Sequence, residues 1–306
     1  MPDPRKGVAL ALGGFTLWGI FPLYFVLLAH VDSGEVLAHR ILWSLVLLAL
    51  LLALQGRLRA SLATLRELRR LVFYILTALL VSLNWLIYIW ATQNQHVIDA
   101  SLGYFINPLV SVLLALLFLG ERLRTMQWSA VGLATIGVAI LVVRFGAVPW
   151  IALGLAGTFA AYSLLRKKAG LPAMEGLFVE TLLAAPLALL WLACMTQQGQ
   201  LAFGSADTAT NLLLALAGLV TVLPLVLFLS SLPHLRLSTI GIIQYVTPTL
   251  QFGCGLALGE PFGAVQGVSF GFIWLALGVF TFDALQHAPR QSVPATMEVP
   301  RQDIHP

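Results

Sequence analysis

Two stretches, one in each half of the chain, place polar side chains directly before a proline. Their members are Ser101, Tyr104, Asn107 and Pro108 in the first stretch and Gln244, Tyr245, Thr247 and Pro248 in the second. Hydroxyl and amide groups at this spacing can hydrogen-bond a polar organic solute, and each proline frees a backbone carbonyl one turn earlier. Helix breaks at equivalent positions in the two halves of a chain are typical of transporter binding sites. We therefore expect this set to line a solute-binding cavity. The alternative is that both prolines are structural kinks only.

Ionisable residues within apolar stretches form the second set of candidates. Arg40 is expected roughly 7–8 Å below the outer membrane boundary if its helix begins near Glu35, at about 1.5 Å per residue. An Arg at that depth predicts an ion pair or a solute anchor, with snorkelling to the surface as the alternative. Glu180 is the candidate partner, although a direct pair requires both residues to approach the mid-plane of the membrane.

Two further groups complete the candidate site. His39 shares a helical face with Glu35 and Trp43. A His beside a carboxylate can carry a proton and couple transport to the proton gradient, whereas the alternative is a structural hydrogen bond to that carboxylate. The third group is Asn84 with Trp85 and Tyr88, whose amide must find a partner and so either joins two helices or faces a wet cavity. This aromatic and amide inventory favours a neutral or zwitterionic solute.

Composition indicates that these residues are carried by membrane helices. Hydrophobic residues make up 59% of the chain, charged residues 10%, and the mean hydropathy is +0.92. Soluble domains carry roughly 25% charged residues, so we predict an all-α integral membrane protein. Ten transmembrane spans are expected, at 7–28, 35–54, 71–92, 99–119, 127–143, 149–165, 173–195, 211–232, 239–258 and 264–286.

The distribution of Lys and Arg predicts the orientation. With the N-terminus in the cytoplasm, all of the 17 Lys and Arg residues except Arg40 and Arg144 fall in cytoplasmic segments. Both termini are therefore expected on the cytoplasmic side of the membrane. Residues 287–306 are rich in proline and are predicted to be a disordered cytoplasmic tail.

The chain contains the same unit twice. Each proline is followed by a Gly-Glu pair, Gly120-Glu121 and Gly259-Glu260, and then by a Gln and a Gly at equal spacing. We assign residues 1–146 to a first five-helix repeat and 147–286 to a second, and an odd number of spans per repeat inverts the second copy. Both glutamates are expected to cap the turn into the following helix.

Several kinds of site are not expected. The sequence has no phosphate-binding loop, no metal-ligand spacing and no nucleophile elbow, so we predict no cofactor, no metal and no catalytic residue. The expected partners are a small organic solute, the lipid bilayer and protons as the candidate coupling ion, and no nucleic acid is expected. The protein is expected to be a monomer or a homodimer. A rival of another class is a membrane-embedded enzyme acting on lipid head groups, for which Glu35, His39 and Asp99 are the candidate residues.

Three segments carry a resemblance to a known family. They are GEVLAHRILWS at 34–44, NWLIYIWA at 84–91 and DASLGYFINPL at 99–109. With the duplicated pattern, they resemble the RarD-type branch of the EamA family in the drug/metabolite transporter superfamily. The resemblance implies a ten-helix inner-membrane secondary transporter, working by alternating access on a drug or metabolite and associated by name with chloramphenicol. Uptake of a metabolite or exchange is the alternative. Thr247 stands where the first copy has Asn107, so the chemistry of the two copies is not expected to be identical.

Overall fold

The computed structural model describes residues 3–93, 97–145, 149–170, 172–257 and 263–286, and these form helices without any β-strand. The elements are α1 (Pro4–Gly19), α2 (Phe21–Val26), α3 (Ser33–Leu54), α4 (Leu58–Ala63), the 3₁₀ helix η1 (Thr64–Arg66), α5 (Leu68–Gln93), α6 (Val97–Leu119), α7 (Thr125–Phe145), α8 (Trp150–Ala169), α9 (Ala173–Gln197), α10 (Thr208–Ser231), α11 (Leu237–Ile243), α12 (Val246–Ala257) and α13 (Ala264–Gln286). The all-α prediction is confirmed. The predicted tail at 287–306 lies outside the described residues.

Each of the ten predicted ranges falls on a helix or on a pair of consecutive helices. The first range corresponds to α1 and α2 together, and the ninth to α11 and α12. Among the described residues, 7 helices are long and apolar enough to cross a bilayer, and α13 adds a shorter apolar stretch, Gly267–Asp283. The chain is therefore an integral membrane protein with several spanning helices, while the full set of ten crossings stays a prediction.

Local signals in the sequence fix where several helices begin and end. Asp3 caps α1, Asp32 caps α3 and Asp207 caps α10, each by accepting a hydrogen bond from a backbone N–H of the first turn. Hydrogen bonds from the side chain and backbone of Thr210 hold the pKa of Asp207 below its usual value. At the other end of a helix, Gly170 follows α8 with a φ of 60°, a left-handed conformation that glycine adopts at little cost.

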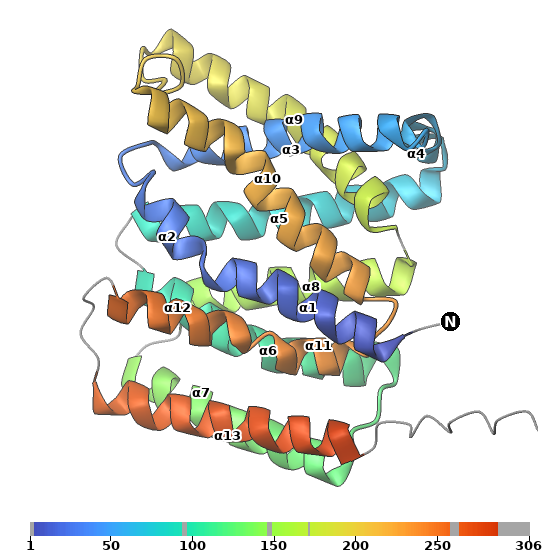
Figure 1. The fold of residues 1–306 in the computed structure, drawn as a ribbon, viewed down its shortest axis with the longest axis vertical. Coiled ribbons are helices and arrows are strands. Elements are labelled where there is room, and N and C mark those ends of the chain that lie inside the picture. The colour runs from blue at the N-terminus through green and yellow to red at the C-terminus, as the bar shows by residue number, and fades with distance from the viewer. Residues whose placement is uncertain (1–2, 94–96, 146–148, 171, 258–262, 287–306) are drawn as a thin grey trace, which may run out of the picture.

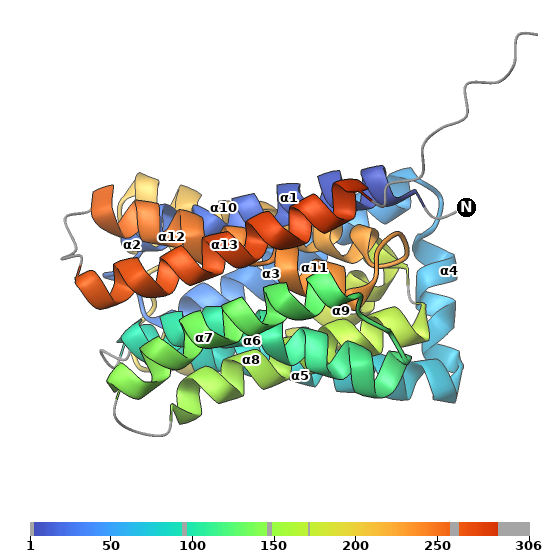
Figure 2. The same ribbon diagram turned by 90° about the horizontal axis from the view of Figure 1, so that it is seen from below.

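The helices lie side by side in two layers, as Figures 1 and 2 show. In Figure 2, α1, α12 and α13 lie on one side of the molecule and α5, α6, α7 and α8 on the other. Helix α3 packs against α9 and α10, α7 packs against α13, and α6 packs against α8 and α11. Contacts between helices from the two halves of the chain therefore build most of the interior.

Small residues allow the closest of these contacts. A Cβ added to Gly218 in α10 would lie 2.4 Å from the backbone carbon of Trp43 in α3. A Cβ added to Gly241 in α11 would lie 2.9 Å from the carbonyl oxygen of Pro108 in α6. Glycine lets helix backbones approach in this way in membrane proteins. The two proline-containing segments thus touch each other.

The prediction of two broken helices is correct for one copy and wrong for the other. The ninth predicted span is interrupted at Gln244 and Tyr245, just before Pro248. Helix α6, in contrast, continues through Pro108 without a break. A proline inside a membrane helix removes one hydrogen bond, and neighbouring helices can compensate for that loss. The close packing of α11 on α6 at Pro108 is consistent with this explanation.

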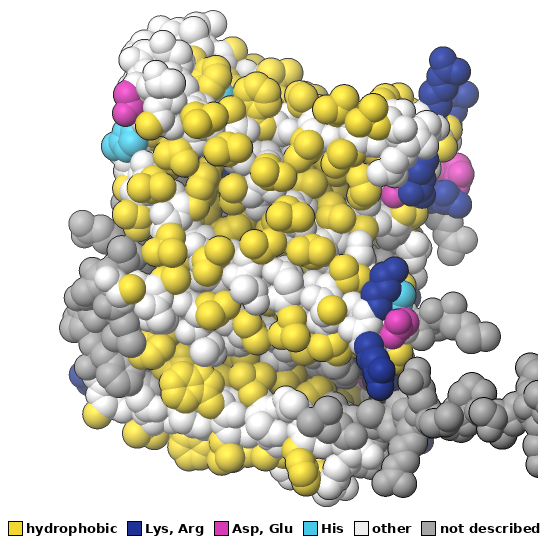
Figure 3. Space-filling model, in the orientation of Figure 1, with side chains coloured by type: hydrophobic (Ala, Val, Ile, Leu, Met, Phe, Trp, Pro, Cys, Tyr) yellow, Lys and Arg dark blue, Asp and Glu magenta, His cyan; other side chains and the backbone are white. Residues whose placement is uncertain are grey.

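The surface divides into an apolar middle and charged ends. Figure 3 shows hydrophobic side chains over the body of the molecule, with Lys and Arg gathered at the end where α4 and the N-terminus lie. Large apolar side chains such as Leu117, Leu187 and Leu190 are each more than 60% exposed. In water such a surface would drive aggregation, but it suits the hydrocarbon of a bilayer.

Candidate solute-binding site

A cavity lies between helices of both halves of the chain. Its walls are formed by Trp18, Phe21, Phe25, Arg40, Asn84, Trp85, Tyr88, Gly103, Tyr104, Asn107, Leu155, Phe159, Gln244, Thr247 and Gln251. The space open to the centres of water molecules is about 60 Å³, enough for roughly four waters. Pockets that hold drug-sized ligands measure about 300–1,000 Å³, so an organic solute can enter only if the helices move apart.

Arg40 is the charged group of this cavity. The side chain is 5% exposed, and its Nε donates a hydrogen bond to Thr221 Oγ1 in α10 at 3.0 Å. The guanidinium carbon lies 4.7 Å from the Trp85 ring centre and 5.5 Å from that of Phe25. Such cation–π contacts contribute about 0.5–2 kcal/mol each and offset part of the cost of burying the charge. Arg40 is thus held inside the protein and does not snorkel to the surface.

Aromatic rings form the walls around Arg40. Tyr88 of α5 and Tyr104 of α6 meet edge to face with ring centres 5.8 Å apart, and Tyr88 also contacts Phe25 of α2. On the other side, Trp18 of α1 and Phe159 of α8 meet edge to face at 5.6 Å. Edge-to-face contact is a favourable arrangement for aromatic rings.

The amide and hydroxyl groups of the cavity play two different roles. Asn84 donates to the Leu155 carbonyl and to Thr158 Oγ1, both at 2.9 Å, so it joins α5 to α8 while lining the cavity. The hydroxyl of Thr247 is committed to the Phe15 carbonyl at 2.9 Å. The Gln244 side chain, in contrast, makes no hydrogen bond with any described residue.

The structure brings eight of the predicted site residues to this one cavity. They are Arg40, Asn84, Trp85, Tyr88, Tyr104, Asn107, Gln244 and Thr247. Asn107 lines the cavity and accepts a hydrogen bond from Ser111 at 3.4 Å through its Oδ1, and its amide NH₂ donates to none of the described residues. Tyr245 is 0% exposed and packs in the apolar core below, while the side chains of Ser101 and Asp99 lie outside the described residues.

Glu180 does not line the cavity, and its proposed pair with Arg40 is wrong. Its carboxylate accepts hydrogen bonds from Arg166 Nη1 at 3.3 Å and from the Tyr162 hydroxyl at 3.2 Å. Arg166 and Glu180 are each 1% exposed. Arg166 lies one helix earlier in the chain, and a Cβ on Gly176 would collide with its guanidinium. This pair holds α8 to α9.

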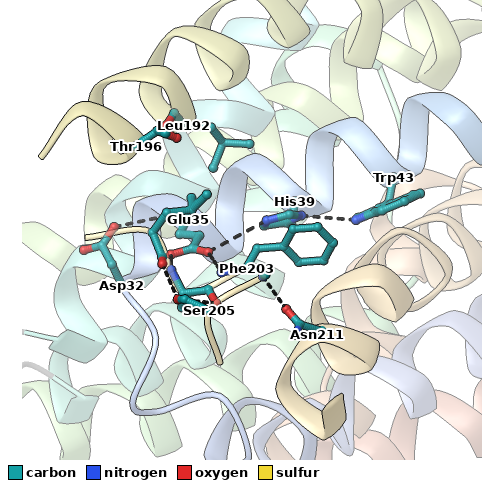
Figure 4. A network of polar contacts seen from close by, with 12 residues as sticks. Asp32, Glu35, His39, Trp43, Leu192, Thr196, Phe203, Ser205 and Asn211 are labelled. Atoms are coloured by element: carbon teal, nitrogen blue, oxygen red, sulfur yellow. Dashed lines mark hydrogen bonds and ion pairs between the residues drawn. The ribbon is translucent and has the colours of Figure 1, made fainter. Parts of the chain in front are cut away.

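The residues around His39 form a separate cluster at the opposite end from α4, shown in Figure 4. The Glu35 carboxylate accepts hydrogen bonds from the backbone N–H groups of Ala202 and Phe203 at 2.8 and 2.7 Å. His39 accepts a hydrogen bond from Trp43 Nε1 at 3.1 Å, its ring contacts Phe203, and its Nε2 lies 3.9 Å from Glu35. His39 and Trp43 therefore do not line the cavity, and Glu35 fixes the loop between α9 and α10.

A second carboxylate performs a similar task at the other end. Glu121 was expected to cap the helix that follows it, but it accepts hydrogen bonds from the N–H groups of Leu237 and Ser238 at 2.8 and 3.1 Å. Those residues begin α11, so Glu121 joins the end of α6 to the other half of the chain. Its counterpart Glu260 lies outside the described residues.

Sequence reasoning missed the apolar half of the cavity. Trp18, Phe21 and Phe25 occur at intervals of three and four, a helical-face pattern that would have grouped them. Gln251 follows Pro248 by less than one helical turn and donates to the Trp18 carbonyl at 3.3 Å. Leu155, Phe159 and Gly103 carry no signal that distinguishes them from ordinary helix-packing residues.

Comparison with known proteins identifies the family and agrees with the fold. The model of the EamA-like transporter family matches residues 5–143. An uncharacterized transporter of Vibrio cholerae is 47% identical over 95% of this chain and 97% of that protein. Protein RarD of Escherichia coli is 43% identical over 94% of this chain and 98% of its own length.

Two further comparisons extend this result. The chloramphenicol-sensitive protein RarD of Pseudomonas aeruginosa is 35% identical over 94% of this chain and 97% of that protein. One protein of known crystal structure, 18% identical, superposes with a TM-score of 0.69 over 92% of this chain and all of its own, which shows a shared fold. Because identity above 40% extends over nearly the whole chain, the protein belongs to the RarD-type branch of the EamA-like transporter family.

Proposed function

We propose that the chain is a secondary transporter of the bacterial inner membrane that moves a small amphipathic or zwitterionic organic solute by alternating access. The observation that carries this proposal is the cavity, because it is built from both halves of the chain. Its walls combine aromatic rings, four side-chain amides and one guanidinium, a set suited to a small organic molecule. Proteins with 43–47% identity that are named as transporters or as RarD support the assignment.

The proposal includes ten crossings, an inverted five-plus-five repeat and cytoplasmic termini. The coincidence of every predicted span with helical segments supports the number of crossings. The gathering of Lys and Arg at the end that carries the N-terminus supports the orientation. Single cysteines introduced at Arg59 and at Trp150 test it in intact cells. An impermeant thiol reagent should label the cysteine at 150 and not the one at 59, and the reverse pattern would overturn the topology.

The cavity as seen has to widen before a solute can enter it. At one end Glu35 holds the loop between α9 and α10, and at the other Glu121 holds the start of α11. In alternating access the two ends open in turn, so we propose that one of these anchors releases in each open state. A proton taken up by the His39 and Glu35 pair is the candidate coupling event. It would act on the contact between Glu35 and the loop from α9 to α10, and not on the solute.

The deciding experiment is counterflow in proteoliposomes loaded with one solute class at a time, namely amino acids, nucleosides and chloramphenicol-like amphiphiles, with and without a pH gradient. We expect exchange of one class, abolished by Asn107→Ala. Thr135→Ala is the matched control, because Thr135 is exposed on α7 and bonds only within its own helix. If solute flux persists in the Asn107→Ala variant, the cavity is not part of the path by which the solute crosses the membrane. A reaction product in place of flux would favour the lipid head-group enzyme.

A further inference from the structure

The charge balance of the cavity points to the substrate's own charge. Arg40 is 5% exposed and lines the cavity, yet no carboxylate among the described residues lies within ion-pair distance of it. Its side chain instead donates a hydrogen bond to the neutral hydroxyl of Thr221. An Arg buried in a membrane protein without a counter-ion is costly, and such residues mark sites of function. A group that supplies the missing negative charge is therefore favoured next to Arg40.

The carboxylates in the surrounding structure are already committed elsewhere. Glu35 is 0% exposed and bonded to two backbone N–H groups, and Glu180 is bonded to Arg166 and Tyr162. Asp32 and Asp207 cap helices. None of the described residues that line the cavity is Asp or Glu. The cavity therefore offers one fixed positive charge and no fixed negative charge.

We propose, resting on the transport function above, that the solute is a monoanion whose carboxylate pairs with Arg40 and whose remainder is aromatic or apolar. The guanidinium presents a planar fork that binds a carboxylate in two parallel hydrogen bonds. One of its nitrogens is fixed by Thr221. The rings of Phe25 and Trp85 stack near the guanidinium and leave the remaining N–H groups to the solute.

The rest of the cavity suits the other part of such a molecule. Trp18, Phe159 and Tyr104 offer ring faces and edges, and the amide NH₂ of Asn107 adds a donor. A cationic amine would face Arg40 without a carboxylate to balance it. A zwitterion would have to place its ammonium group against neutral amide and hydroxyl oxygens. A solute with a single negative charge would neutralise the positive charge of Arg40 and would add no further charge to the cavity.

A matched series of solutes tests the charge while keeping the ring and the chain length constant. It consists of 3-phenylpropanoate, 3-phenylpropanamide, 3-phenylpropylamine and phenylalanine, supplemented by benzoate, octanoate and indole-3-acetate to vary the apolar part. Binding to the purified full chain is followed by the rise in its unfolding temperature with ligand concentration. We expect 3-phenylpropanoate to bind at least ten-fold more tightly than its amide, and the amine to bind most weakly.

Variants then test the residue. Arg40→Gln should abolish the preference for the carboxylate over the amide, Arg40→Lys should retain part of it, and Thr221→Val should weaken it several-fold. Arg144→Gln is the matched control, because Arg144 is exposed and does not line the cavity. If the Arg40 variants do not fold, the solute series on the unmodified protein decides the question alone.

The results separate this inference from the proposed function. Binding of no carboxylate in the series, equal binding of acid and amide, or tighter binding of phenylalanine than of 3-phenylpropanoate would each overturn the monoanion. Flux of amides or amines in the counterflow assay would then leave transport standing. Conversely, carboxylate-selective binding without flux in proteoliposomes would overturn transport and leave the anion site standing.

Discussion

Replacing Glu180 by Gln is expected to destabilise the protein strongly without blocking solute binding. The carboxylate is 1% exposed and receives hydrogen bonds from Arg166 and Tyr162. The substitution leaves the Arg166 guanidinium buried without a counter-ion among the described residues. Its Nη2 still donates to the carbonyl oxygens of Pro172 and Ala173 at 3.2 and 3.1 Å. Its Nε has no hydrogen-bond partner within the described part of the chain even before the substitution.

These contacts set the expected size of the effect. Breaking a buried ion pair by removing one partner costs about 3–5 kcal/mol. Because two carbonyls still accept hydrogen bonds from Arg166, we expect the lower end, about 3 kcal/mol. At roughly 2 °C per kcal/mol for a large chain, the unfolding temperature should fall by about 6 °C. The double variant Arg166→Met, Glu180→Met removes both charges and should recover at least half of the loss.

The assay is unfolding of the purified protein in mixed detergent micelles, followed by circular dichroism, for single and double variants in one cycle. Glu67→Gln is the matched control, because Glu67 also pairs with an Arg, at 2.8 Å, but both side chains are more than half exposed. Such a surface pair contributes about 0–1 kcal/mol. A loss below 1 kcal/mol for Glu180→Gln, or a double variant equal to the sum of the singles, would refute the reasoning.

Three further substitutions probe the contacts between helices. Gly218→Ala should lower the free energy of unfolding by about 1–3 kcal/mol, because the added methyl would collide with the backbone of Trp43. Gly132→Ala is its control, because a methyl there meets no described atom within 4 Å and should not lower that free energy. Unfolding of the two variants side by side compares them directly. Asn84→Ala should cost about 0.6–1.5 kcal/mol by the same assay, since it removes two hydrogen bonds to α8, and an unchanged midpoint would contradict that role. Glu121→Gln should raise the proteolytic sensitivity of the loop before α11, because a neutral amide replaces a carboxylate that accepts from two backbone N–H groups.

Much of the fold was predictable because its signals are local. Runs of apolar residues broken by Asp caps and glycines give the helix ranges, since each signal acts within one or two turns. The spacing of Tyr104 and Asn107 predicts that they share a side of α6 for the same reason, and both line the cavity. Arg40 and Asn84 were identified because polar groups in hydrocarbon require partners.

The failures concern partners that lie on other helices. Glu180 is the candidate partner of Arg40 by sequence, but its partner in the structure is Arg166 on the neighbouring helix α8. No pattern along α9 indicates which neighbour that face contacts. Glu121 bonds residues more than 100 positions later for the same reason. Pro108 was predicted to break its helix, whereas the effect of a proline depends on what packs against it. Periodicity gives the face of a helix, and only tertiary structure gives its neighbour.

The distribution of charge within the described protein connects these observations to function. Arg166 is neutralised by Glu180, and Arg124 forms an ion pair with Asp283. Those pairs join helices, and once formed they leave no net charge to attract a solute. Arg40 differs because it lines the cavity and has a hydroxyl and aromatic rings as its partners. If the protein used Arg40 only for packing, a carboxylate partner or an apolar side chain would serve better, since both avoid an uncompensated buried charge. A charge left for the ligand explains why the residue is an arginine.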